Sequence, residues 1–108
     1  MDYIQRRKFL RKKTLIPGTI IIPKDEISVE IDSLSGNGAT VHILNFPGSL
    51  PNEFYIKFSF SGRNFNLKVN MVWEKRDTKF LDIGIRFIID SKSRDFIVEK
   101  ILSGLLKK

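Results

Sequence analysis

Side chains capable of acid–base, nucleophilic or metal chemistry are sparse in this sequence. Its 108 residues include one histidine, His42, and no cysteine, which excludes disulfides, zinc–thiolate sites and thiol nucleophiles. His42 belongs to an alternating run and falls on the polar face, which is expected to meet water. Carboxylate pairs at residues 25–26 and at Glu30 with Asp32 lack the pocket that catalytic carboxylates need. Glycine-rich phosphate loops are also absent, so we expect no metal, no cofactor and no enzyme activity.

Positive charge is concentrated in the first 13 residues. The chain has a net charge of +7, and this segment contributes +5 through six lysines and arginines against Asp2. A local excess of this kind indicates an anionic partner, with a solvated basic tail as the alternative. Arginine is suited to clamp a phosphate or the O6/N7 edge of guanine. Arg7 and Arg11, with Arg6 beside them, span roughly 13 Å on an extended chain, enough to contact opposite sides of a nucleotide-sized ligand.

A second candidate binding segment is the glycine-rich stretch 33–39, SLSGNGA. Ser33 and Ser35 supply hydroxyl groups, and the glycines expose backbone N–H groups to a ligand. Gly38 would allow either a close backbone approach or a positive φ. The alternative is a plain hairpin turn, whose geometry serine, asparagine and glycine satisfy without any ligand.

The elements that must position these segments follow from a period-two pattern, which is typical of antiparallel strands with one buried face. Turn residues separate five such runs, and the β-branched stretch 15–22 adds a first strand; together they predict a mainly β fold, a small antiparallel six-stranded barrel. Trp73 and most other aromatic residues share the core-facing phase, which argues against a nucleic-acid platform of exposed rings. The predicted strands cover 15–22, 27–32, 39–43, 54–60, 65–73 and 81–89, with a long crossing connection at 44–52.

The pattern changes to helical spacing near the C-terminus, after Asp90 or Ser91 as the N-cap. We expect this helix to pack against an open end of the barrel; a dimer contact is the alternative. The expected organisation is one domain, 1–108, with a flexible basic arm at 1–13, the barrel at 14–90 and the helix at 91–108.

Taken together and in this order, the two candidate segments resemble the PilZ family of bacterial cyclic di-GMP receptors. That family is marked by RxxxR in an N-terminal loop and by [D/N]xSxxG further along the chain. Arg7 and Arg11 match the first motif, and Ser35 and Gly38 match the second. Later strand motifs of the family have counterparts in Val72-Trp73 and Gly84-Ile85-Arg86-Phe87. The resemblance implies a PilZ-like split barrel, in agreement with the periodicity.

One position departs from the family pattern, because Ser33 stands where the family has Asp or Asn. Asp32 is not expected to substitute, since a shift of one residue moves a side chain to the other face of a sheet. In the family that residue helps to read guanine. A lost hydrogen bond costs roughly 1–3 kcal/mol, or about 5- to 150-fold in affinity, so weaker binding is expected.

The resemblance implies a cytoplasmic cyclic di-GMP receptor that signals to an effector protein. Arg6, Arg7 and Arg11 would grip phosphate and guanine, while Ser33, Ser35 and the Gly38 turn hold a guanine edge. The arginine loop would become ordered on binding. The absence of cysteine is compatible with the cytoplasm, no membrane partner is expected, and the oligomeric state stays open. The alternatives are a degenerate PilZ domain that acts through protein contacts and a basic barrel that binds nucleic acid nonspecifically.

Overall fold

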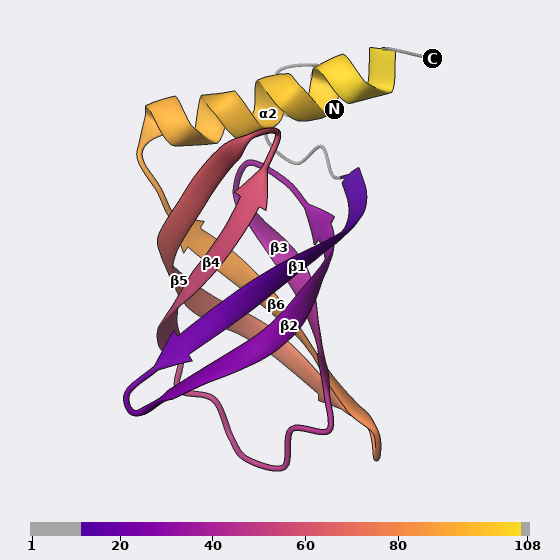
Figure 1. The fold of residues 1–108 in the computed structure, drawn as a ribbon, viewed down its shortest axis with the longest axis vertical. Coiled ribbons are helices and arrows are strands. Elements are labelled where there is room, and N and C mark those ends of the chain that lie inside the picture. Colours follow the sequence, from indigo (N-terminus) through magenta and orange to yellow (C-terminus); the bar gives the residue numbers. More distant parts are fainter. Residues whose placement is uncertain (1–11, 107–108) are drawn as a thin grey trace.

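The computed structural model describes the backbone of residues 12–106 and the side chains of residues 15–104. Six antiparallel strands form a closed barrel in the order β1-β2-β3-β6-β5-β4, and one helix lies across its end (Figure 1). This confirms the predicted barrel with a C-terminal helix. The elements are β1 (Lys12–Ile22), β2 (Asp25–Leu34), β3 (Gly38–Leu44), β4 (Glu53–Phe60), β5 (Arg63–Arg76), β6 (Phe80–Ile88) and α2 (Ser91–Leu106).

The barrel interior is filled by aliphatic and aromatic side chains that alternate with polar ones along the strands. In β4, for example, Phe54, Ile56 and Phe58 are buried while Tyr55 and Lys57 are exposed. Alternation of this kind gives each strand one dry and one wet face. Side chains with no exposed surface come from every strand: Ile20, Ile31, Val41, Ile56, Val69 and Ile83.

The connection between β3 and β4 crosses the end of the barrel opposite the helix, as the sequence predicts, because these strands are not neighbours (Figure 1). Leu50 from this connection is buried in the core. The Arg76 guanidinium donates hydrogen bonds to the carbonyl oxygens of Phe46 and Gly48, at 2.7 and 2.6 Å. These bonds attach the crossing segment to the end of β5.

Helix α2 closes the other end of the barrel, where Ile97 and Ile101 are fully buried among the strand side chains. Asp90 is its N-cap and accepts a hydrogen bond from the backbone N–H of Ser93 at 3.1 Å. Hydrogen bonds from the Ser93 hydroxyl and backbone hold the pKa of Asp90 below its ordinary value. Arg63, at the start of β5, donates to the Ser93 hydroxyl at 3.1 Å and so joins a hairpin to the helix. Within the described residues, no helix is long and apolar enough to cross a membrane.

Strict alternation fails at three bulges, each of which adds one residue to a strand relative to its partner. A bulge changes which residues face the core beyond it. Trp73 is therefore 46% exposed on the outer face, and its predicted place in the core is wrong. The bulges lie between Lys13 and Ile16 in β1, between Ile31 and Ser33 in β2, and between Met71 and Trp73 in β5.

Replacing Ile97 by Ala tests the contact between helix and barrel. The variant should lose about 2–5 kcal/mol of unfolding free energy, because a fully buried isoleucine leaves a cavity. Glu99→Ala, on the exposed face of the same helix, should change it by no more than about 0.5 kcal/mol. Urea denaturation followed by circular dichroism measures both, and equal midpoints would show that the helix does not seal the core.

Candidate functional site

The hairpin between β2 and β3 is held by the hydroxyl of Ser35, which is only 2% exposed. This hydroxyl accepts hydrogen bonds from the backbone N–H groups of Asn37 and Gly38, at 3.3 and 3.2 Å. It also lies 3.2 Å from the carbonyl oxygen of Gly38, to which it donates. Ser35 therefore shapes the turn from inside, and its hydroxyl faces the hairpin rather than open solvent.

The glycines of this hairpin permit close packing on two sides. A Cβ atom at Gly38 would lie 2.0 Å from the carbonyl oxygen of Ile85 on β6, and one at Gly36 would lie 2.5 Å from Val98 on α2. Gly38 does not have a positive φ, so of the two roles expected for it the close approach is the one observed. The hairpin is thus held between β6 and the helix.

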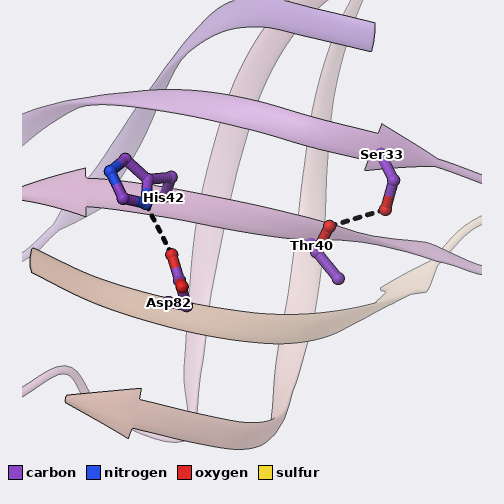
Figure 2. A network of polar contacts seen from close by, with 4 residues as sticks. All are labelled: Ser33, Thr40, His42 and Asp82. Atoms are coloured by element: carbon purple, nitrogen blue, oxygen red, sulfur yellow. Dashed lines mark hydrogen bonds and ion pairs between the residues drawn. The ribbon is translucent and has the colours of Figure 1, made fainter. Parts of the chain in front are cut away.

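Ser33 lies on the outer face of the barrel, where its hydroxyl is 2.5 Å from the hydroxyl of Thr40 (Figure 2). Asp32 lies on this face too, because its carboxylate is within 4.8 Å of ligand atoms of His42 and Asp82. The bulge between Ile31 and Ser33 explains how consecutive side chains share one face. The expectation that Asp32 points to the other face is therefore wrong.

A pocket of about 440 Å³ lies on the same outer face, beside the hairpin. Trp73 forms one wall, and its ring packs directly against Gly84, where an added Cβ would lie 2.1 Å from the indole nitrogen. Arg86, directly opposite Gly38 in the strand register, contributes an exposed guanidinium with no hydrogen bond or ion pair among the described residues. Thr40 provides a hydroxyl. We call this hollow the outer pocket, and it is lined by Ser35, Asn37, Gly38, Ala39, Thr40, Val72, Trp73, Gly84, Ile85 and Arg86.

A larger hollow of about 700 Å³ lies between β1 and β4, but its lining is less suited to an anion. It combines apolar side chains such as Phe58 and Phe65 with neutral polar groups, and Lys57 is its one charged residue. The outer pocket, in contrast, combines the motif hairpin with an aromatic ring and a guanidinium that is unpaired within residues 15–104. We therefore take the outer pocket as the candidate ligand site.

Arg6, Arg7 and Arg11 lie outside the described residues, so the structure does not place them. It does place the residue that follows them, because Lys12 pairs with Leu34 and Lys13 pairs with Ser33. Covalent geometry limits the Cα of Arg11 to about 3.8 Å from that of Lys12, and the Cα of Arg7 to within about 18 Å. Chain length thus permits both arginines to reach the hairpin. The pairing also shows that Lys12 and Lys13, predicted as part of the arm, belong to the barrel.

Of the outer-pocket residues, the sequence predicted only Ser35 and Gly38 as site residues, and it missed Thr40, Trp73 and Arg86 among others. Trp73 was assigned to the core by strict alternation, and only the bulge in β5 reverses that assignment. Arg86 had a detectable signal, since it is the one basic residue of a largely apolar strand and lies two residues after a glycine. The pairing of Thr40 with both Ser33 and Gly84 depends on long-range register.

A family model of the PilZ domain matches residues 5–103. The chain belongs to the PilZ domain family. The match covers both candidate segments, including the arginines that precede β1. No sequence among curated proteins matches the chain.

Solved structures share the fold of this PilZ domain. An inhibitor of motility from Bacillus subtilis (MotI/DgrA) has a TM-score of 0.76 at 13% identity, over 92% of this chain and 51% of its own. The PilZ domain of CeSA from a cellulose-synthesizing bacterium has a TM-score of 0.60 at 20% identity, over 89% and 97%. PlzA from Borreliella burgdorferi, in complex with c-di-GMP, has a TM-score of 0.60 at 13% identity, over 100% and 52%. At these identities the likeness shows the fold alone, and the chain spans about half the length of MotI/DgrA and PlzA.

Replacing Gly38 by Ala tests the packing of the motif hairpin. The new Cβ would meet backbone rather than a movable side chain, so the variant should lose about 1–3 kcal/mol or more of unfolding free energy. Gly48→Ala is the matched control, because its nearest atom is 3.4 Å away and its φ is not positive; its stability should be unchanged or higher by up to about 1 kcal/mol. Thermal and urea unfolding compare the two, and similar losses would contradict a specific close approach at Gly38.

Proposed function

We propose that this PilZ domain binds cyclic di-GMP in the outer pocket and acts as a receptor that signals to a partner protein, without enzyme activity. The observation that carries the proposal is the pairing of Lys13 with Ser33, which brings the chain into the barrel next to the motif hairpin. Membership of the PilZ family supports this choice of ligand.

The chemistry of the outer pocket matches a ligand that carries phosphates and purine rings. Arg86 offers a planar guanidinium that has no partner among the described residues, and such a group binds phosphate or the O6/N7 edge of guanine in a bidentate manner. Trp73 offers an exposed ring on which a base could stack, an interaction worth about 1–3 kcal/mol. Thr40 supplies a hydroxyl group for a base edge, and the hydroxyl of Ser33, which does not line the pocket, lies beside it. Arg7 and Arg11, with Arg6 assisting, would hold the phosphates from the other side.

In this proposal the arginine segment closes over the ligand and is held there by it. Each arginine contributes a charge-assisted hydrogen bond, which is roughly twice as strong as a neutral one. The surface so formed lies beside β1 and the hairpin, which itself contacts helix α2 through Gly36. An effector protein that recognises this surface would then bind in a ligand-dependent way.

A second candidate function is a PilZ domain that no longer binds nucleotide and acts through protein contacts. The observation that favours it is Ser33, whose hydroxyl already bonds to Thr40 and replaces the Asp or Asn of the motif. A serine that is already paired must break this bond, or share it, before it contacts guanine. Ligand titration separates the two functions.

Calorimetric titration with cyclic di-GMP is the direct test. We expect saturable binding, and a loss of about 10- to 150-fold in affinity for both Arg7→Ala and Arg11→Ala, because each removes a charge-assisted bond worth about 1.5–3 kcal/mol. Lys79→Ala removes the same charge at the opposite end of the barrel and should bind normally. Trp73 is the only tryptophan, so its fluorescence gives an independent reading of the outer pocket.

Other outcomes of this titration would point elsewhere. Absence of heat and of a fluorescence change with wild-type protein would support the protein-contact function. Equal binding of GMP, or binding of any oligonucleotide with a steep salt dependence, would support nonspecific nucleic-acid binding.

Restoring the family residue tests the role of position 33. Ser33→Asn should tighten cyclic di-GMP binding by about 5- to 150-fold, because an amide makes two hydrogen bonds to a base edge where a hydroxyl makes one. Asparagine is preferable to aspartate here, since it adds no charge beside Asp32. Ser28→Asn, on the exposed face of the same strand but nearer its other end, should leave affinity unchanged. An unchanged affinity in Ser33→Asn would show that the ligand does not contact this position.

A further inference from the structure

Three side chains with metal-ligating atoms converge on the outer face of the barrel. Two of them, His42 and Asp82, lie two residues along their strands from Thr40 and Gly84 of the outer pocket. His42 on β3 lies 2.6 Å from a carboxylate oxygen of Asp82 on β6, measured from its Nδ1 atom (Figure 2). Asp32 on β2 completes the group, and one ligand atom from each residue lies within 4.8 Å of the others. All three side chains are partly buried, so they are accessible to an ion from solvent.

The backbone holds these residues together. His42 and Asp82 are direct partners in the β3–β6 register, so their side chains leave the sheet side by side. Asp32 joins them because it lies two residues after Glu30, the partner of His42 on β2, and so shares its face of the strand. The ring of Phe80 lies 4.9 Å from the imidazole ring and restricts its orientation. The three ligand atoms therefore come from three adjacent strands rather than from mobile loops.

The local charge is opposite to that of the whole chain, which is +7. Glu30 is the direct partner of His42 on β2, so three carboxylates from Glu30, Asp32 and Asp82 surround one imidazole. Lys75 is opposite Asp82 on β5, but among residues 15–104 no lysine or arginine forms an ion pair with these three carboxylates. Like charges this close repel one another, and a bound cation would relieve the repulsion.

We propose that Asp32, His42 and Asp82 bind one divalent transition-metal ion of the Zn²⁺ type. One imidazole with two carboxylates is a ligand set that Zn²⁺ accepts, with water in the open fourth position. Bonds of about 2.0–2.2 Å place tetrahedral ligand atoms about 3.3–3.5 Å apart. The distance between His42 Nδ1 and the Asp82 oxygen must increase slightly from 2.6 Å. The largest distance between ligand atoms, at most 4.8 Å, must decrease. Rotation of these partly exposed side chains achieves both changes. This site does not depend on the proposed binding of cyclic di-GMP.

Metal titration of the tag-free, nucleotide-free protein tests this site. Calorimetry should show one Zn²⁺ per chain, with weaker binding of Co²⁺ and Mn²⁺ and none of Mg²⁺, which prefers oxygen ligands and an octahedral shell. Because His42 is the only histidine and cysteine is absent, its imidazole NMR signals report on the site alone. Those signals should shift with Zn²⁺ and broaden with Co²⁺.

Single substitutions identify the ligands. Loss of a residue that only hydrogen-bonds to a metal ligand typically weakens metal binding by about 10- to 100-fold. His42→Ala and Asp32→Asn remove ligands themselves, so each should weaken Zn²⁺ binding by more than this. Asp95→Asn, which removes the same charge on helix α2, should bind Zn²⁺ normally. Asp32→Asn is nearly isosteric, so it keeps the test valid if His42→Ala is unstable. Absence of stoichiometric Zn²⁺ binding, or binding that survives both substitutions, would overturn the proposal and leave His42 and Asp82 as a hydrogen-bonded pair only.

Discussion

The register between β2, β3 and β6 on the outer face of the barrel is the constraint from which both candidate sites follow. Ser33 is opposite Thr40, which is opposite Gly84, so one row crosses three strands. The next row on that face places His42 opposite Asp82. Because side chains on one face of a strand recur every two residues, each row is separated from the next by about 7 Å. A slip of one residue in any of these strands would move that strand's side chains from these rows into the core.

The glycines at 36, 38 and 84 make this register possible on the hairpin side of the barrel. Each lies where a larger residue would collide, with Val98 of the helix, with the backbone of β6 and with the Trp73 ring respectively. The hairpin can therefore lie close to both β6 and α2, and the indole can lie flat enough to form a pocket wall. In this chain the motif glycine, Gly38, allows the hairpin to pack closely against β6, and a ligand would bind to the surface that this packing creates.

The fold was predictable from sequence because it depends on local periodicity. Period-two runs identified five of the six strands, and a short β-branched stretch identified the first. The proline-containing connection identified the crossing between β3 and β4, and helical spacing identified α2. The candidate site was predictable only in part. A bulge shifts the alternation by one residue, and no local sequence pattern indicated the bulges here. Strict alternation therefore assigned Trp73 to the core and placed Asp32 on the opposite face from Ser33. The proximity of His42 to Asp82 spans 40 residues and depends on strand order, which no short motif encodes.

The two candidate sites on this face carry charges of opposite sign, from Arg86 in the outer pocket and from Asp32 and Asp82 in the proposed metal site. They are close enough for the charge of one to affect ligand binding at the other. Gly84 lines the outer pocket and Asp82 lies two residues away on β6, so a phosphate in the pocket would lie about 7 Å from the Asp82 carboxylate. Two unit charges at that distance interact by about 0.6 kcal/mol in water and about 2.4 kcal/mol at the lower effective dielectric near a protein surface. Unneutralised carboxylates would therefore weaken anion binding by a measurable amount. A divalent cation held between them would remove most of that cost, because it neutralises the charge of the two aspartates without altering the barrel.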